Sequence, residues 1–128
     1  MRSRQSLIKE ADRLFGLWVK LSMRNHNGYI ECFVCKKMFL LDEIDAGHFI
    51  PRRYLATRWH RVNVWPECIN DNRFNSKHLK PYEARLKSMF GDDIIDALWY
   101  EAHNGNIPTD DDIRSIIKLY KDKLSVLL

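Results

Sequence analysis

The amino-acid sequence predicts an α+β fold with an N-terminal helix, a central zinc-stabilised core of two strands and a helix, and a C-terminal helical section. Three observations lead to this prediction. Apolar residues repeat at helical spacing near the start, three cysteines bracket a central stretch of short strands, and helical spacing returns after residue 81. A chain of 128 residues is large enough for one core. We therefore expect a single domain, 1–128, with parts at 1–28, 29–80 and 81–128.

The first element is a helix over about residues 4–23. Its apolar residues recur every three or four positions, with charged residues between them. They are Leu7, Ile8, Ala11, Leu14, Phe15, Trp18, Val19 and Leu21. A stripe of this kind packs into a core, so we assign it no chemistry. The run from Asn25 to Gly28 then breaks the helix and turns the chain.

The central part is predicted to form short strands around the cysteines. A strand over 29–31 leads into the first cysteine pair. Residues 36–41 and 44–50 are expected to be the two arms of a hairpin, and Pro51 stops the second arm.

After this hairpin, residues 52–62 show no period and are expected to form a loop. A returning strand over 63–65 is predicted to end at Pro66. From Asp71 onward the chain should turn helical, because aspartate and asparagine favour helix starts.

The last part of the chain is predicted to be helical. A first helix begins near Pro81 and closes at Gly91, and the run 104–106 ends a second. Thr109, with Asp112 three residues later, resembles a capping box at the start of a third helix. These helices are expected to be scaffold or a dimer surface.

The cysteine spacing predicts a zinc site. Cys32 and Cys35 form a C-x-x-C pair, which holds one metal ion from a tight turn. Cys68 begins a second such run, whose last position is Asp71 instead of cysteine. A carboxylate oxygen is also a zinc ligand, so these four residues are the predicted set.

Two alternatives remain open for the fourth ligand. Asp71 is also suited to capping a helix, and His60 or His78 is able to take its place in the zinc site. The odd cysteine count and the lack of an apolar signal segment indicate a reduced compartment, where thiolates serve metals. No apolar run is long enough to span a membrane.

Positive charge is concentrated around the cysteine-bracketed segment. The net charge is +4, and the basic excess lies in 51–90 whereas 91–128 is acidic. Aromatic residues stand between the arginines, a mixture that suits a phosphate backbone. The predicted phosphate contacts, as a group, are Arg52, Arg53, Arg58, Arg73 and Lys77.

The same segment carries residues suited to phosphodiester hydrolysis. His48 titrates near neutral pH and is the candidate general base. Asp45 and Asn72 offer oxygen ligands, which Mg²⁺ or Mn²⁺ prefers. Strand alternation places Asp45 and His48 on opposite faces, so we expect a bend at Gly47 to bring them together.

In combination these motifs resemble the phage NinG/Rap recombination endonuclease family, which belongs to the HNH, or ββα-metal, treble-clef zinc nucleases. The motifs that carry the resemblance are Cys32–Cys35, Asp45–Phe49, Arg58–Trp59, Asn63–Pro66 and Cys68–Asn72. The resemblance implies a structure-specific DNA endonuclease that cuts Holliday junctions and D-loops. A more distant similarity, to phage endonuclease VII, rests on an asparagine that follows the last cysteine and binds the catalytic metal there.

Matched position by position, the resemblance assigns His48 as the general base and Asn63 as the residue that braces the loop and orients the base. It assigns Asn72 to the catalytic metal and the three cysteines to zinc. Two positions depart from the pattern. Asp71 replaces the fourth cysteine, and Gly47 stands where many HNH proteins have an aspartate ligand.

The preferred function is therefore a DNA endonuclease with structural zinc and catalytic Mg²⁺ or Mn²⁺, located in the cytoplasm of a phage-infected bacterium. Paired cuts across a junction favour a homodimer. The alternative is a zinc-stabilised DNA-binding recombination accessory protein with weak or no nuclease activity. A third hypothesis, a protein-interaction module with an incidental basic face, predicts no salt-sensitive DNA binding.

Overall fold

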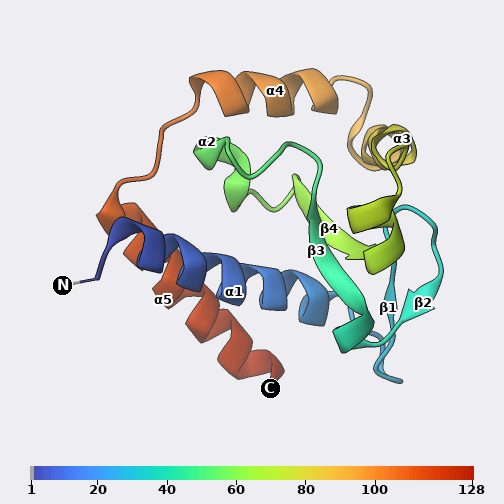
Figure 1. Ribbon diagram of the computed structural model, residues 1–128, viewed down its shortest axis with the longest axis horizontal. Helices are drawn as coiled ribbons and strands as arrows, with labels where there is room; N and C mark the ends of the chain where they lie inside the picture. Colours follow the sequence, from blue (N-terminus) through green and yellow to red (C-terminus); the bar gives the residue numbers. More distant parts are fainter. Residues whose placement is uncertain (1) are drawn as a thin grey trace.

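The computed structural model describes residues 2–128 and confirms the α+β class (Figure 1). The helices are α1 (Arg4–Ser22), α2 (Leu55–Arg58), α3 (Leu79–Phe90), α4 (Ile94–Asn104) and α5 (Asp110–Leu127). The strands are β1 (Ile30–Glu31), β2 (Met38–Phe39), β3 (Ile44–His48) and β4 (Val64–Cys68). A 3₁₀ turn, η1 (Leu41–Glu43), precedes β3, and a π-helical turn, η2 (Asn70–Phe74), follows β4. Within residues 2–128, no helix is long and apolar enough to cross a membrane.

The strands form two small antiparallel sheets, β1–β2 and β3–β4. The predicted hairpin between 36–41 and 44–50 is therefore wrong. The cysteine turn folds the chain back on itself, with the Cys32 N–H donating to the Lys37 carbonyl at 2.8 Å. Lys36 takes a left-handed φ of 65° within this turn. Met38 and Phe39 consequently pair with β1, and β3 is left to pair with β4.

Strand β4 continues through Pro66, where we had predicted its end. The Pro66 carbonyl accepts a hydrogen bond from the Phe33 N–H at 2.8 Å, so it points away from β3. In an antiparallel ladder the nitrogen of such a residue points the same way. Proline therefore costs no hydrogen bond to β3 at this position, and the strand reaches Cys68.

The structure confirms helix ends that the sequence predicted, such as Gly91 after α3 and Thr109 before α5. Ser3 caps α1 by accepting the Ser6 N–H, and Gly91 closes α3 with a φ of 98°. Thr109 and Asp112 form the predicted capping box of α5. The expected loop 52–62 also contains the one-turn helix α2, which the sequence pattern did not indicate.

Two apolar clusters lie on the two sides of the β3–β4 sheet (Figure 1). On one side α1 packs against α5, and buried residues of both helices join Val64 and Trp59. On the other side α3 and α4 cover Phe33, Phe49 and Ile50. Strand β3 has β4 as its one neighbour in the sheet, so its outer edge is free and faces the space between α1 and the start of α3.

Candidate metal centre and adjoining cleft

The predicted zinc ligands gather at one point. Cys32 and Cys35 lie in the turn after β1, Cys68 ends β4, and Asp71 lies in η2. Their ligand atoms are all within 4.8 Å of one another. The Cys35 and Cys68 sulfur atoms are 4.0 Å apart, and Asp71 Oδ2 lies 3.5 Å from Cys32 Sγ and 3.2 Å from Cys68 Sγ.

These distances fit a tetrahedral zinc ion. Bonds of about 2.3 Å to sulfur and about 2.0 Å to oxygen place two sulfur atoms about 3.8 Å apart and an oxygen about 3.5 Å from each sulfur. The three separations given above, 3.2–4.0 Å, bracket both values, and the remaining pairs lie within 4.8 Å. The predicted gathering of three cysteines and one aspartate into a possible metal site is confirmed.

Both alternatives for the fourth ligand are overturned by the geometry. Asp71 caps no helix; its carboxylate accepts from the Asn75 amide at 3.1 Å and faces the sulfur atoms. His60 accepts the Val62 N–H through Nδ1 at 3.2 Å, and His78 pairs with Glu67.

The electrostatics of this cluster favour a cation. Burial raises the pKa of the Cys35 and Cys68 thiols, so both resist ionisation on their own. Burial also opposes ionisation of Asp71, but hydrogen bonds from Asn75 and the thiols outweigh it and lower the pKa of that carboxyl. The N–H groups of Cys35 and Cys68 donate to Cys32 Sγ at 3.5 and 3.3 Å. A bound Zn²⁺ would supply the positive charge that converts the thiols to thiolates.

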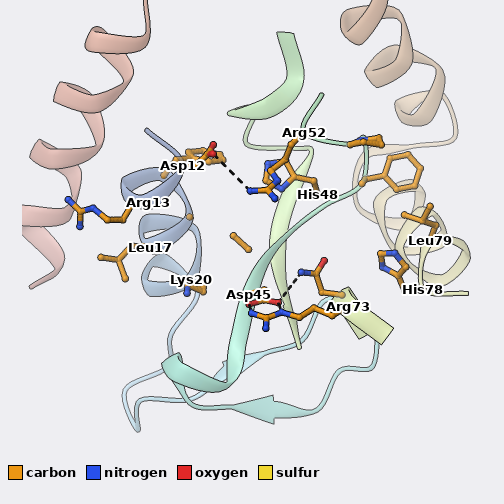
Figure 2. Close-up of a pocket in the computed structure, with 16 residues that line it drawn as sticks. Asp12, Arg13, Leu17, Lys20, Asp45, His48, Arg52, Arg73, His78 and Leu79 are labelled. Carbon is orange, nitrogen blue, oxygen red and sulfur yellow. Dashed lines mark hydrogen bonds and ion pairs between the residues drawn. The ribbon is translucent and has the colours of Figure 1, made fainter. Parts of the chain in front are cut away.

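A cleft of about 820 Å³ lies beside this cluster and runs along the free edge of β3 (Figure 2). One wall is α1, and the other is formed by η2 and the residues that open α3. His48, Asp45 and Asn72, the three residues predicted for catalysis and catalytic-metal binding, all line it.

His48 is held in one orientation. Its Nε2 lies 2.9 Å from the Arg58 carbonyl oxygen, which is only an acceptor. Nε2 must therefore carry the proton, and the lone pair is on Nδ1. Burial lowers the pKa of His48, and the hydrogen bond to the Arg58 carbonyl opposes that shift without reversing it. The imidazole is therefore neutral near pH 7 and suited to accept a proton.

Asn63 stabilises the loop that carries Arg58, the residue whose carbonyl binds His48. The residue is fully buried, and its amide nitrogen donates to the carbonyls of Ile50 and Thr57, both at 3.1 Å. Its amide oxygen accepts the Ile50 N–H at 2.7 Å. These three hydrogen bonds hold the segment after β3 against the segment before β4. This arrangement is compatible with the predicted role of Asn63 in bracing the loop.

Asp12, on the α1 wall of the cleft, holds the same loop through Arg58 and Trp59. The sequence analysis assigned Asp12 no role in the site. Its carboxylate accepts from Arg58 Nε at 2.9 Å, Arg58 Nη2 at 2.6 Å and Trp59 Nε1 at 3.0 Å. Arg58 is the residue whose carbonyl orients His48. The charged pair thus acts on His48 through the backbone.

The spacing of residues in α1 could have indicated that this helix forms one wall of the cleft. Asp12, Gly16 and Lys20 stand four residues apart and form one row on the helix, which lines the cleft beside Arg13. Gly16 belongs to this row because a Cβ there would lie 3.4 Å from Ala46 Cβ, so α1 approaches β3 closely.

Asp45 and Asn72 meet in the cleft without the predicted bend at Gly47. Pairing with β4 is unbroken from Ile44 to His48, so Asp45 and His48 project to opposite faces of β3. Both still line the cleft because it wraps around the free edge of the strand. The prediction of a bend at Gly47 is therefore wrong. No bend is needed, because residues on both faces of an edge strand can line a cleft that runs along its free edge.

Asp45 is shared between two partners. The Asn72 amide donates to Asp45 Oδ2 at 3.0 Å, and Arg73 binds both carboxylate oxygens at 2.8 Å. Burial opposes ionisation of Asp45, but Arg73 and Asn72 outweigh it and lower the pKa of the carboxyl. An aspartate and an asparagine side by side supply the oxygen donors that Mg²⁺ or Mn²⁺ takes from a protein, so the residues fit such an ion.

The predicted phosphate contacts divide into two groups. Arg52 and Arg73 line the cleft with side chains 62% and 56% exposed. Arg58 is only 16% exposed and is bound to Asp12, which gives it an internal role instead of the predicted one. Arg53 packs over the Tyr54 ring and Lys77 is exposed, and both lie outside the cleft lining. Lys20 of α1 brings positive charge to the cleft that the sequence analysis did not foresee, whereas Arg13, which also lines the cleft, is paired with Glu10 at 2.6 Å.

A buried pair, Glu67 and His78, lies beside the cleft and was also missed. His78 Nδ1 is 2.5 Å from Glu67 Oε2, and the Glu67 side chain is fully buried. Gly47 leaves room for this carboxylate, because a Cβ on residue 47 would lie 2.2 Å from Glu67 Oε1. The glycine before His48 is therefore required by packing.

Over residues 1–127 the chain matches the family model described as Bacteriophage Lambda NinG protein. No curated protein and no solved structure matches the chain.

Proposed function

The chain belongs to the bacteriophage lambda NinG protein family, and from that premise we propose that it is a divalent-metal-dependent DNA endonuclease. Its substrates are branched recombination intermediates such as Holliday junctions and D-loops, in the cytoplasm of the bacterial host. The observation that carries the proposal is His48, a neutral imidazole held by the Arg58 carbonyl at 2.9 Å in a cleft with oxygen donors and arginines.

His48 is the general base. With Nε2 donating to the Arg58 carbonyl, Nδ1 is free to take a proton from a water molecule that attacks phosphorus. The resulting imidazolium keeps its Nε2–H bond, so the ring does not reorient during the transfer. Asp12 and Asn63 keep the loop carrying this carbonyl in place.

Asp45 and Asn72 hold the catalytic cation. A Mg²⁺ or Mn²⁺ ion bound there supplies a positive charge that stabilises the departing 3′ oxygen. To hold this ion, the carboxylate of Asp45 would give up its bidentate contact with Arg73, and the guanidinium would then be available to the DNA backbone.

The cationic residues of the cleft bind the substrate. Arg13, Lys20, Arg52 and Arg73 come from both walls and from the segment after β3. Contacts of this type grip phosphates and carry no base information, which suits an enzyme that selects DNA by shape. A homodimer with two-fold symmetry places two such clefts on one junction for paired cuts.

Zinc has a structural role in this scheme. Three cysteines and Asp71 fill a tetrahedral site and leave no position for a substrate. Held by these four residues, the ion would join the turn after β1 to the end of β4 and to η2, which carries Asn72.

The test is cleavage of a labelled four-way junction and a matched linear duplex with Mg²⁺, Mn²⁺ or EDTA. Wild type should cut the junction in a metal-dependent manner, and His48→Ala should lose roughly 10²–10⁴-fold in rate while it still binds the junction. His26→Ala is the matched control, because His26 is exposed and lies outside the cleft lining. Cutting by His48→Ala at the wild-type rate would remove His48 from the mechanism.

One observation favours the DNA-binding accessory protein as a second candidate. The bidentate contact of Arg73 with Asp45 occupies both oxygens of a proposed metal ligand. If that contact persists on DNA, the protein binds junctions without cutting them. Salt-sensitive junction binding with no cleavage by wild type in either metal would establish this candidate in place of the nuclease.

A further inference from the structure

We propose that Glu67 and His78 complete the cation site of the cleft, with His78 Nε2 as a metal ligand and Glu67 as its positioning residue. The inference rests on the proposed function, to which it adds a third ligand and a preference for Mn²⁺ over Mg²⁺. It starts from two observations: an imidazole with one nitrogen anchored, and a buried carboxylate oxygen with no partner.

His78 presents one nitrogen to the cleft. The residue immediately precedes α3, lines the cleft and keeps 17% of its side chain exposed (Figure 2). Nδ1 lies 2.5 Å from Glu67 Oε2. When that carboxylate accepts the Nδ1 proton, the lone pair of the ring is on Nε2. Metal-binding histidines commonly have this arrangement, because the carboxylate fixes the tautomer and makes the free nitrogen a stronger donor.

Glu67 connects His78 to the rest of the cation site. It lies on β4 directly opposite Asp45, so the two side chains share one face of the sheet. Asp45 in turn contacts Asn72 at 3.0 Å. His78, Asp45 and Asn72 thus line the cleft, and the fully buried Glu67 connects His78 to Asp45 beside it.

The other oxygen of Glu67 is unsatisfied. Among the buried side-chain nitrogen and oxygen atoms of residues 2–128, Glu67 Oε1 is the one without a hydrogen-bond partner. Such an orphaned oxygen is costly, and it points to a partner such as an ion or an ion-bound water. Gly47 preserves the space around it, since a Cβ at that residue would lie 2.2 Å from Oε1.

A site with this donor set selects among metals. Carboxylate and amide oxygens suit Mg²⁺ and Mn²⁺ alike, whereas imidazole nitrogen favours the transition ion. A cleft that combines Asp45, Asn72 and His78 should therefore bind Mn²⁺ more tightly than Mg²⁺. Without His78 the site is reduced to oxygen donors, and the preference should shrink.

The experiment is calorimetric titration of the zinc-loaded full chain with Mn²⁺ and separately with Mg²⁺, in the absence of DNA. We expect His78→Ala to weaken Mn²⁺ binding by about tenfold or more and to change Mg²⁺ binding less. Glu67→Gln should weaken Mn²⁺ binding by roughly 10–100-fold, since it removes the charge that supports His78. His26→Ala, which removes an exposed histidine, should match wild type.

Zinc content and thermal unfolding of each variant show whether the fold is intact. If Glu67→Gln proves unstable, His78→Gln serves as the second variant, because it leaves the buried carboxylate in place. Mn²⁺ affinity of folded His78→Ala and His78→Gln within twofold of wild type would overturn the inference.

The outcome is separable from that of the proposed function. If wild type cuts junctions and Mn²⁺ affinity does not depend on His78, the proposed nuclease is supported and His78 is refuted as a metal ligand. Binding of Mn²⁺ that depends on His78, in a protein that never cuts DNA, would support the site and refute the nuclease.

Discussion

The cysteine cluster lies at the end of β4 and the cleft runs along the free edge of its partner β3, and the two sites differ in how their donor atoms are held. In the cluster, four donor atoms converge within 4.8 Å and face one another, with little access for water. In the cleft, each donor is held by a different protein group: His48 by the Arg58 carbonyl, Asp45 by Arg73 and Asn72. A closed set of ligands stabilises a fold, whereas an open set leaves room for a substrate. The cluster therefore has the form of a structural metal site, and the cleft has the open form that the proposed catalytic site requires.

Removal of zinc should have the largest effect on this comparison. The cluster joins the turn after β1 to β4 and η2, and without an ion its two buried thiols, the half-buried Cys35 thiol and the Asp71 carboxylate would have no common partner. We expect a strong chelator to lower the free energy of unfolding by on the order of 5 kcal/mol or more, and to abolish junction cutting. Thermal unfolding with and without zinc measures the change.

Removal of Mg²⁺ or Mn²⁺ is the matching control. It should stop cutting and leave the melting temperature of the zinc-loaded protein nearly unchanged, because the cleft donors already have protein partners. Equal destabilisation by loss of either ion would contradict the distinction between a closed and an open site.

A methyl group at Gly47 should have the next largest effect. In Gly47→Ala the new Cβ would lie 2.2 Å from Glu67 Oε1 and 2.7 Å from Glu67 Cβ, so the two strands must separate. We expect a loss of about 1–3 kcal/mol in unfolding free energy, measured by urea denaturation.

Gly16→Ala is the paired variant on the opposite wall. Its Cβ would lie 3.4 Å from Ala46 Cβ, an ordinary contact, and alanine favours a helix interior by up to about 1 kcal/mol. Equal or greater stability is therefore expected. If Gly47→Ala were as stable as Gly16→Ala, the close packing of Glu67 against β3 would be refuted.

The smallest expected effect concerns pH. Burial lowers the pKa of His48 below its usual 6.5, so the base should stay neutral and active at pH 6.5. Below the lowered pKa, kcat/KM should fall about tenfold per pH unit. The unfolded chain binds this proton first, so the stability contributed by neutral His48 is full above the unfolded pKa and declines as pH falls below it. An acid limb centred above 6.5 would contradict the burial argument.

Local patterns predicted more of the cluster than of the cleft. The C-x-x-C spacing predicted the four residues that gather into the possible metal site, with the fourth position left open, and caps such as Thr109 and Gly91 placed helix ends, because each of these signals acts within a few residues. His48 and Asn63 also followed from the motif. Their partners did not: Arg58 is bound by Asp12, which lies on a helix far earlier in the chain.

The errors share a physical cause. Strand partners depend on how the chain is turned by the cysteine cluster, so β2 paired with β1 and not with β3. The role of Gly47 depends on Glu67, which reaches it across the sheet. Contacts between distant segments decide both, and no period within a single segment encodes them.

The packing of α1 against α5 has a consequence for how the protein is made. The wall that carries Asp12 and Lys20 shares its buried face with Ile113, Ile117 and Tyr120 of α5. During translation α1 emerges before α5, and its apolar stripe stays uncovered until α5 has left the ribosome. The zinc ligands emerge in between and are ready to bind their ion early. The α1 wall of the cleft should therefore be packed in place only after α5 has left the ribosome, and the proposed nuclease would become active no earlier than that.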